Sequence, residues 1–194
     1  MKEKLRNVVR KVLSDNWATL YKIEYDFLYK DGSWKRQERE SYDRGDGACV
    51  LLYNRIKKSV ILTKQFRMPI YENTSVDGMS IEVCAGSLEK NENPRLGIIR
   101  EVEEEVGYKI EDIKEVIQSY MSPGAVTEKL YMFIAEYTDE MKVNEGGGLE
   151  SEGEEIEVLE MPFSKAIEML EKGEIKDAKT IMLLQYAQIH NLLN

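Results

Sequence analysis

The sequence predicts a mixed α/β protein, in which a small antiparallel sheet precedes a larger mixed sheet flanked by helices. Residues 19–44 contain two aromatic-rich, alternating runs on either side of an Asp-Gly turn, as in a β-hairpin. Beyond this hairpin, short apolar runs mix with helical patterns and show no repeating βαβ period. We therefore expect an N-terminal antiparallel sheet at 1–44 and a main domain at 45–194.

The N-terminal region reads as an antiparallel unit. Residues 19–29 and 34–44 are expected strands, and the Lys-Asp-Gly-Ser segment at 30–33 is the turn between them. Residues 4–13 have apolar spacing typical of a helix, and a first strand is the alternative. A sheet this small is marginal alone, so it should pack on the main domain or on another subunit.

The main domain has alternating strand and helix patterns. Before residue 90 we expect two strands in 46–63, a polar loop at 71–78 and a strand at 80–86. After residue 110 we expect two strands in 115–137, a Gly-rich acidic loop at 138–155, a strand at 155–162, and helices at 163–171 and 178–193.

Between these parts, residues 86–108 predict a loop followed by a short helix. Asn93 suits the N-cap, Pro94 the first helical position and Gly107 the left-handed C-terminal position. Four apolar residues recur at helical spacing and should face the core: Leu96, Ile99, Val102 and Val106. Three carboxylates should fall on the opposite, exposed face: Glu101, Glu104 and Glu105.

The acidic face conflicts with local stability. Carboxylates three and four residues apart repel each other, and the C-terminal end of a helix favours cations. A bound divalent cation would offset both effects, and Mg²⁺ prefers oxygen ligands in sites shared with phosphates. The alternative is an ordinary solvated acidic face.

The overall composition narrows the possible partners. A net charge of −9 argues against general binding to nucleic acid or to anionic membranes. No run approaches the ~18 apolar residues of a membrane span. Cys49 and Cys84 lie in apolar runs, which indicates buried free thiols and a cytoplasmic protein.

The full spacing of the stretch resembles the Nudix box, which is Gly, five residues, Glu, seven residues, then Arg-Glu-apolar-any-Glu-Glu-any-Gly-apolar. All seven fixed positions are filled, by Gly86, Glu92, Arg100, Glu101, Glu104, Glu105 and Gly107. Tyr108 is a mild departure at the last apolar position. The resemblance implies a Nudix hydrolase, which cleaves a nucleoside diphosphate linked to another moiety.

Segments over nearly the whole chain resemble the GDP-mannose pyrophosphatase branch of this superfamily, among them LSDNW, QFRMPIY, IEVCAG and YMSPGAVTEKLYMFIAEY. The resemblance implies an α/β/α sandwich preceded by a small sheet that helps to form a homodimer. It favours a strand over a helix at residues 4–13. The implied reaction is Mg²⁺-dependent hydrolysis of GDP-mannose to GMP and mannose 1-phosphate.

The same resemblance implies roles for individual residues. Glu101, Glu105 and the carbonyl of Ala85 match metal ligands, and Glu104 matches a carboxylate that orients or deprotonates water. The acidic loop supplies a further metal ligand. Counting back from Ile156 in the next strand gives Glu154, which we prefer because a strand fixes the register better than a loop, and counting forward from the Gly triplet gives Glu152. Two or three Mg²⁺ ions are implied per site, with Mn²⁺ as a possible substitute. Arg100 and Glu92 fit a supporting ion pair.

Substrate contacts follow from the resemblance in the same way. Trp17 matches an aromatic residue that reaches the nucleotide in the partner subunit, and packing at the dimer interface is the alternative. The other implied substrate-binding residues are Glu38, Arg39, Glu40, Arg67, Ala85, Glu128 and Lys179.

Two other functions remain possible from the sequence. The first is the same chemistry on ADP-ribose, because that sister branch shares the box. The second is a non-catalytic module that binds nucleotide sugars, which the complete set of box glutamates argues against.

Overall fold

The computed structural model describes residues 3–193, apart from the side chain of Glu152. The chain forms two compact units. The N-terminal unit runs through Asp46 and also includes Ser119–Lys129, whereas the main unit comprises Gly47–Gln118 and the chain from Leu130 onward. The 119–129 segment joins the N-terminal unit through Tyr42, whose N–H donates to the Ala125 carbonyl at 2.8 Å.

The N-terminal unit is a three-stranded antiparallel sheet in the order β1 (Leu5–Asp15), β2 (Thr19–Leu28) and β3 (Trp34–Asp43). The predicted turn joins β2 to β3, and Gly32 adopts a φ of 84° there, which a glycine tolerates. The strand expected at residues 4–13 is confirmed. Its helical spacing was misleading because the apolar side chains of β1 are about half exposed and meet no core that would impose a period of two.

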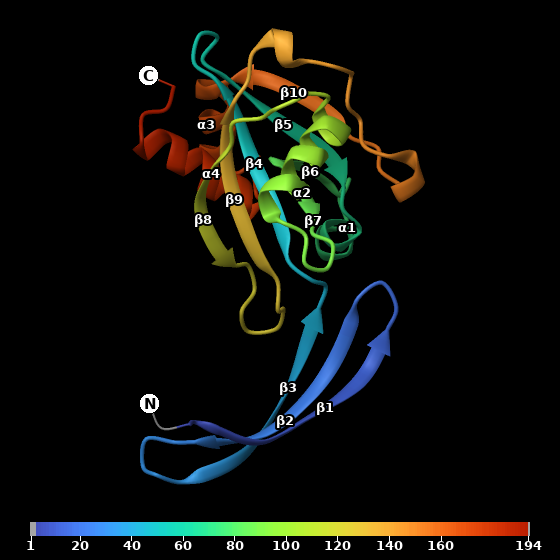
Figure 1. Cartoon of the computed structure of the whole chain (residues 1–194), viewed down its shortest axis with the longest axis vertical. Helices are drawn as coiled ribbons and strands as arrows, with labels where there is room; N and C mark the ends of the chain where they lie inside the picture. Colours follow the sequence, from blue (N-terminus) through green and yellow to red (C-terminus); the bar gives the residue numbers. More distant parts are fainter. Residues whose placement is uncertain (1–2, 194) are drawn as a thin grey trace. The chain divides into compact units, whose positions relative to one another are not determined.

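The main unit contains a mixed sheet in the order β10-β5-β4-β9-β8, with β6 added to β5 and β7 added to β4 (Figure 1). Its central strand β4 runs parallel to β9 and antiparallel to β5 and β7. The strands are β4 (Gly47–Asn54), β5 (Ser59–Phe66), β6 (Met79–Glu82), β7 (Cys84–Ser87), β8 (Lys114–Tyr120), β9 (Lys129–Glu136) and β10 (Glu157–Pro162).

Helices cover both faces of this sheet. The α-helices are α1 (Met68–Thr74), α2 (Pro94–Glu101), α3 (Phe163–Glu171) and α4 (Ala178–Ile189). A π-helix, η1 (Val102–Val106), continues α2, and two 3₁₀ turns, η2 (Asp139–Met141) and η3 (Glu150–Glu152), lie in the acidic loop. Alternate β4 residues pack in one cluster with Ile98 of α2, while α4 also contacts β4. This arrangement confirms the predicted fold class.

Two details of the predicted secondary structure were wrong. The first four residues of the loop expected at 71–78 belong to α1, which begins at Met68 and has a proline in its first turn, where a missing N–H costs little. The single strand expected at 80–86 is two strands, because β6 pairs with β5 and β7 pairs with β4. Between them, the Val83 N–H donates to the Thr180 hydroxyl at 2.8 Å rather than to a neighbouring strand.

The buried face of the box helix also differs from the prediction. Leu96 is 63% exposed, whereas Ile98, Val102 and Val106 are fully buried. Glu105 was expected on the exposed face and is only 1% exposed. The predicted burial of Val102 and Val106 is thus confirmed and Ile99 packs against the core, so the error is confined to Leu96 and Glu105. The last turn widens into a π-helix, with the Gly107 N–H bonded to the Val102 carbonyl at 3.1 Å.

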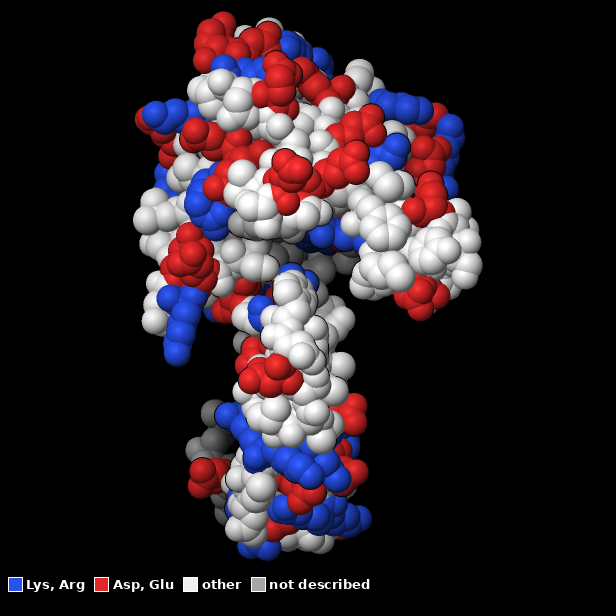
Figure 2. Space-filling model, turned by 90° about the vertical axis from the view of Figure 1, so that its right-hand side faces the viewer, with Lys and Arg blue, Asp and Glu red and all other residues white. Residues whose placement is uncertain are grey.

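Acidic and basic side chains are interspersed over the face of the molecule drawn in Figure 2. Both cysteines are buried and neither forms a disulfide, as predicted. Within residues 3–193, no helix combines the length and the apolar character that a membrane crossing requires.

Candidate active site

The loop and helix at residues 86–107 are held in place by their own side chains. Asn93 caps α2 by accepting the Arg95 N–H at 2.9 Å, as predicted. Glu92 accepts the Glu89 N–H at 2.9 Å and so folds the loop back on itself. Gly107 ends the helix with a φ of 78°, and a β-carbon there would lie 2.2 Å from the Asn144 carbonyl oxygen. Only glycine fits this position.

Gly86 provides the space that the Glu101 carboxylate occupies. A β-carbon at Gly86 would lie 2.1 Å from both Cδ and Oε1 of Glu101, well inside van der Waals contact. The carboxylate therefore lies against the Ala85–Gly86 backbone. Burial raises the pKa of Glu101, the adjacent Arg100 opposes this, and the charges of Glu104 and Glu154 raise the pKa further.

Glu105 is the most buried carboxylate of the box. It accepts the Ala85 N–H at 3.1 Å and a hydrogen bond from the Cys84 thiol. Burial raises its pKa to about 7, these two hydrogen bonds oppose the rise, and the charges of Glu101 and Glu154 add to it. Glu101 and Glu105 thus meet at the same backbone segment, and the charge of Glu101 disfavours the ionised form of Glu105.

The acidic loop brings Glu154 to these carboxylates. The loop is tied to the end of the helix, because the Gly147 and Gly148 N–H groups donate to the Glu105 and Glu104 carbonyls at 2.9 and 3.2 Å. Glu154 accepts the Leu149 N–H at 3.1 Å, and its charge raises the pKa of both Glu101 and Glu105. The alternative ligand, Glu152, has a side chain outside the described residues.

Arg100 lies at the exposed side of the helix and faces three glutamates. It lies 2.9 Å from Glu101 and 2.8 Å from Glu104, but 3.8 Å from Glu92. The predicted Arg100–Glu92 pair is thus the longest of the three contacts. Arg100 offsets part of the repulsion among the box carboxylates and fixes the Glu104 side chain.

The donor atoms suit a hard divalent cation. The charge of Glu154 raises the pKa of both Glu101 and Glu105, the charge of Glu101 raises that of Glu105, and the Ala85 carbonyl belongs to the backbone on which Glu101 and Glu105 pack. A dication relieves such repulsion, and oxygen-only ligands match Mg²⁺. Among the described side chains, no three His, Cys, Asp or Glu residues are grouped closely enough to hold a metal ion by themselves.

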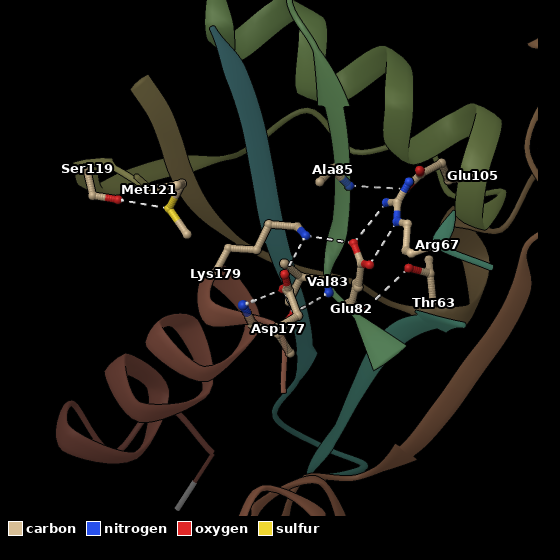
Figure 3. Close-up of polar contacts among 11 residues, drawn as sticks. Thr63, Arg67, Glu82, Val83, Ala85, Glu105, Ser119, Met121, Asp177 and Lys179 are labelled. Carbon is tan, nitrogen blue, oxygen red and sulfur yellow. Dashed lines mark hydrogen bonds and ion pairs between the residues drawn. The ribbon is translucent and has the colours of Figure 1, made fainter. Parts of the chain in front are cut away.

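Arg67 and Lys179, both predicted to bind substrate, meet at a residue that the sequence analysis missed. Glu82 accepts the Arg67 Nε–H and Nη2–H, each at 2.9 Å, and the Lys179 ammonium at 2.6 Å (Figure 3). Lys179 also donates to Asp177 at 2.9 Å. The signal for Glu82 was a charged residue inside the apolar run just before the box, which requires buried partners. Asp177 lies in a Lys-Asp-Ala-Lys segment with no comparable signal.

The remaining predicted residues belong to the N-terminal unit. Trp17 is 75% exposed, with the Arg44 guanidinium 5.1 Å from its ring centre, and Arg44 lies 3.7 Å from Glu128. The structure thus brings Trp17 and Glu128 together through Arg44. On β3, all three predicted contacts are exposed: Glu38, which pairs with Lys22 at 2.8 Å, Arg39, which donates to the Glu38 carbonyl, and Glu40.

Comparison with known families agrees with this geometry. The NUDIX domain model matches residues 43–184, so the chain belongs to the Nudix family of hydrolases, which generally use divalent metal ions. The model described as the GDP-mannose pyrophosphatase NudK N-terminal domain matches residues 4–42.

Curated relatives extend this similarity to the whole chain. The chain is 48% identical to the GDP-mannose pyrophosphatases of Shigella flexneri serotype 5b (strain 8401) and Escherichia coli O6:H1, over 194 residues and the full length of both proteins. It is 47% identical over the same length to that of Escherichia coli O157:H7.

Proposed function

We propose that this protein is a Mg²⁺-dependent GDP-mannose pyrophosphatase that hydrolyses GDP-mannose to GMP and mannose 1-phosphate. The observation that carries the proposal is the full-length similarity to curated GDP-mannose pyrophosphatases, which includes the N-terminal region as well as the Nudix domain. The buried carboxylates of the box supply the chemistry that this reaction needs.

The metal ligands are the carboxylates of Glu101, Glu105 and Glu154 and the carbonyl of Ala85. Their support is the shared position of Glu101 and Glu105 on the Ala85–Gly86 backbone and the electrostatic coupling of both to Glu154. Two or three Mg²⁺ ions, or Mn²⁺ in their place, would supply charge stabilisation at the phosphoryl oxygens and a lower pKa for the attacking water.

A carboxylate of the chain takes the proton of the attacking water, and the two candidates are Glu104 and Glu154. Glu104 is held by Arg100 at 2.8 Å, whereas Glu154 accepts the backbone N–H of Leu149 at 3.1 Å. The pH profile of kcat for Glu104→Gln and for Glu154→Gln separates them, because only loss of the base removes the acidic limb of the profile.

The N-terminal unit supplies the nucleotide contacts. Trp17 stacks on guanine, and Glu38, Arg39, Glu40 and Glu128 bind other parts of GDP-mannose. The exposed ring of Trp17 beside Arg44 supports this role, because a free aromatic face stacks well on a base. Arg67 and Lys179 are the cations for the phosphate oxygens.

The active form is a homodimer in which N-terminal residues complete the partner's site. Its support is the exposed apolar side chains of β1, namely Leu5, Val8, Val9, Val12 and Leu13. A second copy would cover them. We assign dimerisation to residues 1–44 and hydrolysis to residues 45–194, and two buried cysteines that form no disulfide favour a cytoplasmic location.

The test is chromatographic analysis of products after separate incubation with GDP-mannose and ADP-ribose in Mg²⁺. GMP released from GDP-mannose faster than AMP from ADP-ribose supports the proposal. Faster AMP release would move the enzyme to the ADP-ribose branch. Tight binding of GDP-mannose without turnover of either compound would favour the non-catalytic binding module.

A further inference from the structure

The four residues Arg67, Glu82, Asp177 and Lys179 form a charge-balanced cluster in the main unit, which we call the Glu82 cluster (Figure 3). One oxygen of Glu82, Oε2, contacts both Arg67 Nη2 at 2.9 Å and Lys179 Nζ at 2.6 Å. A single carboxylate oxygen therefore holds the two cationic groups next to each other. The Glu82 side chain is 4% exposed and that of Lys179 is 13% exposed.

The cluster is anchored to rigid elements on every side. Arg67 directly follows β5, Glu82 ends β6 and Lys179 lies in the first turn of α4. Asp177 caps α4 by accepting the Thr180 N–H at 3.0 Å, and Thr180 in turn accepts the Val83 N–H at 2.8 Å. The carboxylates that hold both cations are thus tied to β6 and to the start of α4.

Both cations keep hydrogen-bonding capacity after these contacts. An ammonium has three N–H donors and a guanidinium has five. Within residues 3–193, Lys179 has two protein acceptors, and Arg67 uses only Nε and Nη2 toward Glu82. The remaining donors of two adjacent cations suit an anion such as a phosphate.

The cluster also lies beside the box carboxylates. Burial acts to lower the pKa of Arg67, but the hydrogen bond and charge of Glu82 and the charge of Glu105 raise it above its usual value. Arg67 is thus within electrostatic reach of Glu105, and Figure 3 shows its guanidinium between Glu82 and the Ala85–Glu105 pair.

We propose that Glu82 and Asp177 are positioning residues for substrate binding: they hold Arg67 and Lys179 in place so that the free donors of both bind the pyrophosphate oxygens. This inference rests on the proposed function, since it names groups that support that site. It assigns Glu82 and Asp177 no contact with substrate. Their role is to fix two flexible cationic side chains before the anion arrives.

Removal of the Glu82 charge changes the affinity for an anion in opposite directions if Glu82 is a positioning residue and if it acts only through its charge. If the Glu82 charge only added to the local potential, its removal would strengthen binding of an anion. If Glu82 holds the two cations in place, its removal weakens binding, because Arg67 and Lys179 then have to be ordered by the ligand.

The experiment compares Glu82→Gln and Asp177→Asn with the wild type. Asn caps a helix about as well as Asp, so the second variant removes charge and retains the cap. The matched control is Glu160→Gln, because Glu160 is also a strand carboxylate with several partners, Lys57 at 3.0 Å and Tyr137 at 2.9 Å among them. The readouts are KM and kcat on GDP-mannose and the Kd of inorganic pyrophosphate by calorimetry, all in Mg²⁺.

We expect Glu82→Gln to raise both KM and the pyrophosphate Kd about tenfold, with a smaller fall in kcat, and Asp177→Asn to act in the same direction. Glu160→Gln should change neither constant more than twofold. An unchanged or lower pyrophosphate Kd in Glu82→Gln overturns the proposal. An equal rise of the pyrophosphate Kd in Glu160→Gln also overturns it, as does a wild type that binds no pyrophosphate. The binding comparison does not depend on turnover, so wild type that binds pyrophosphate but leaves GDP-mannose intact contradicts only the proposed function.

Discussion

Replacing Gly86 by alanine should remove activity while leaving the fold intact. The added β-carbon would lie 2.1 Å from Cδ of Glu101, whereas carbon atoms pack at about 3.5 Å or more, so the carboxylate has to move by more than about 1 Å. A displacement of this size at a catalytic group costs about 10²-fold in rate, which corresponds to about 2.7 kcal/mol of transition-state stabilisation. We therefore expect kcat/KM on GDP-mannose to fall by about 10²-fold or more.

Stability should change little in the same variant. The atoms that the β-carbon meets are the end of the flexible Glu101 side chain rather than backbone, and Gly86 has an ordinary φ. Gly→Ala at such a position changes the free energy of unfolding by about 1 kcal/mol or less, or a few degrees in Tm. Gly124→Ala is the matched control, because no atom lies within 4 Å of its added β-carbon.

The assay pairs steady-state turnover of GDP-mannose in Mg²⁺ with thermal unfolding. Activity of Gly86→Ala within threefold of the wild type, in folded protein, would refute the assignment of the Glu101 carboxylate to the reaction centre. Loss of both activity and folding would refute the claim that only the carboxylate has to move.

Four further predictions concern other parts of the molecule. Glu105→Gln should lower kcat by about 10²-fold or more in folded protein, because it removes a metal ligand; near-normal turnover contradicts that role. Burial raises the pKa of Glu82, but Arg67 and Lys179 outweigh it and lower the pKa from 4.5 to about 2. Because this pKa is depressed on folding, Glu82 stabilises the protein above pH 4.5 by about 3 kcal/mol, and this is lost as pH falls toward 2. In urea unfolding, the deficit of Glu82→Gln should therefore narrow over that range, and a constant deficit argues against the ion pairs. Trp17→Ala should raise KM about tenfold with little change in kcat, since stacking contributes about 1–3 kcal/mol per base; an unchanged KM favours the interface role. Val9→Asp on the exposed face of β1 should shift the protein from dimer to monomer in light scattering, and an unchanged mass contradicts the assigned interface.

Removal of metal tests the same site without a substitution. A chelator should abolish hydrolysis of GDP-mannose, and added Mg²⁺ or Mn²⁺ should restore it, because the carboxylates of the box are proposed to act only as metal ligands and as a base. Activity that persists at high chelator concentration would contradict the metal assignment.

The sequence predicted most of the fold because the strands and turns are locally determined. The Asp-Gly turn, the aromatic runs around it and the apolar run of β4 each have an unambiguous local meaning. The helix α1 was missed because it has no buried residue, and hence no apolar period that would reveal it.

The sequence located the site through the spacing of the seven box residues, but not the contacts that these residues make. Gly86 leaves space for the Glu101 side chain, and Gly107 leaves space for the Asn144 carbonyl. Neither contact could be predicted, because each joins residues that are distant in the sequence. The burial of Glu105 was not predictable, because its hydrogen-bond partners Ala85 and Cys84 lie about twenty residues away in the sequence and Glu105 lies in a π-helix rather than in a regular α-helix. A charged residue in an apolar run signals that Glu82 needs buried partners, but periodicity does not show that these are Arg67 and Lys179.

Hydrolysis of GDP-mannose in H₂¹⁸O tests the central claim, that the Nudix box directs water to phosphorus, most directly. Mass spectrometry of the products should show one ¹⁸O in a phosphate group, on either GMP or mannose 1-phosphate, and none in the sugar hydroxyls. Formation of GDP together with ¹⁸O-labelled mannose would place the attack at the sugar carbon and contradict the account.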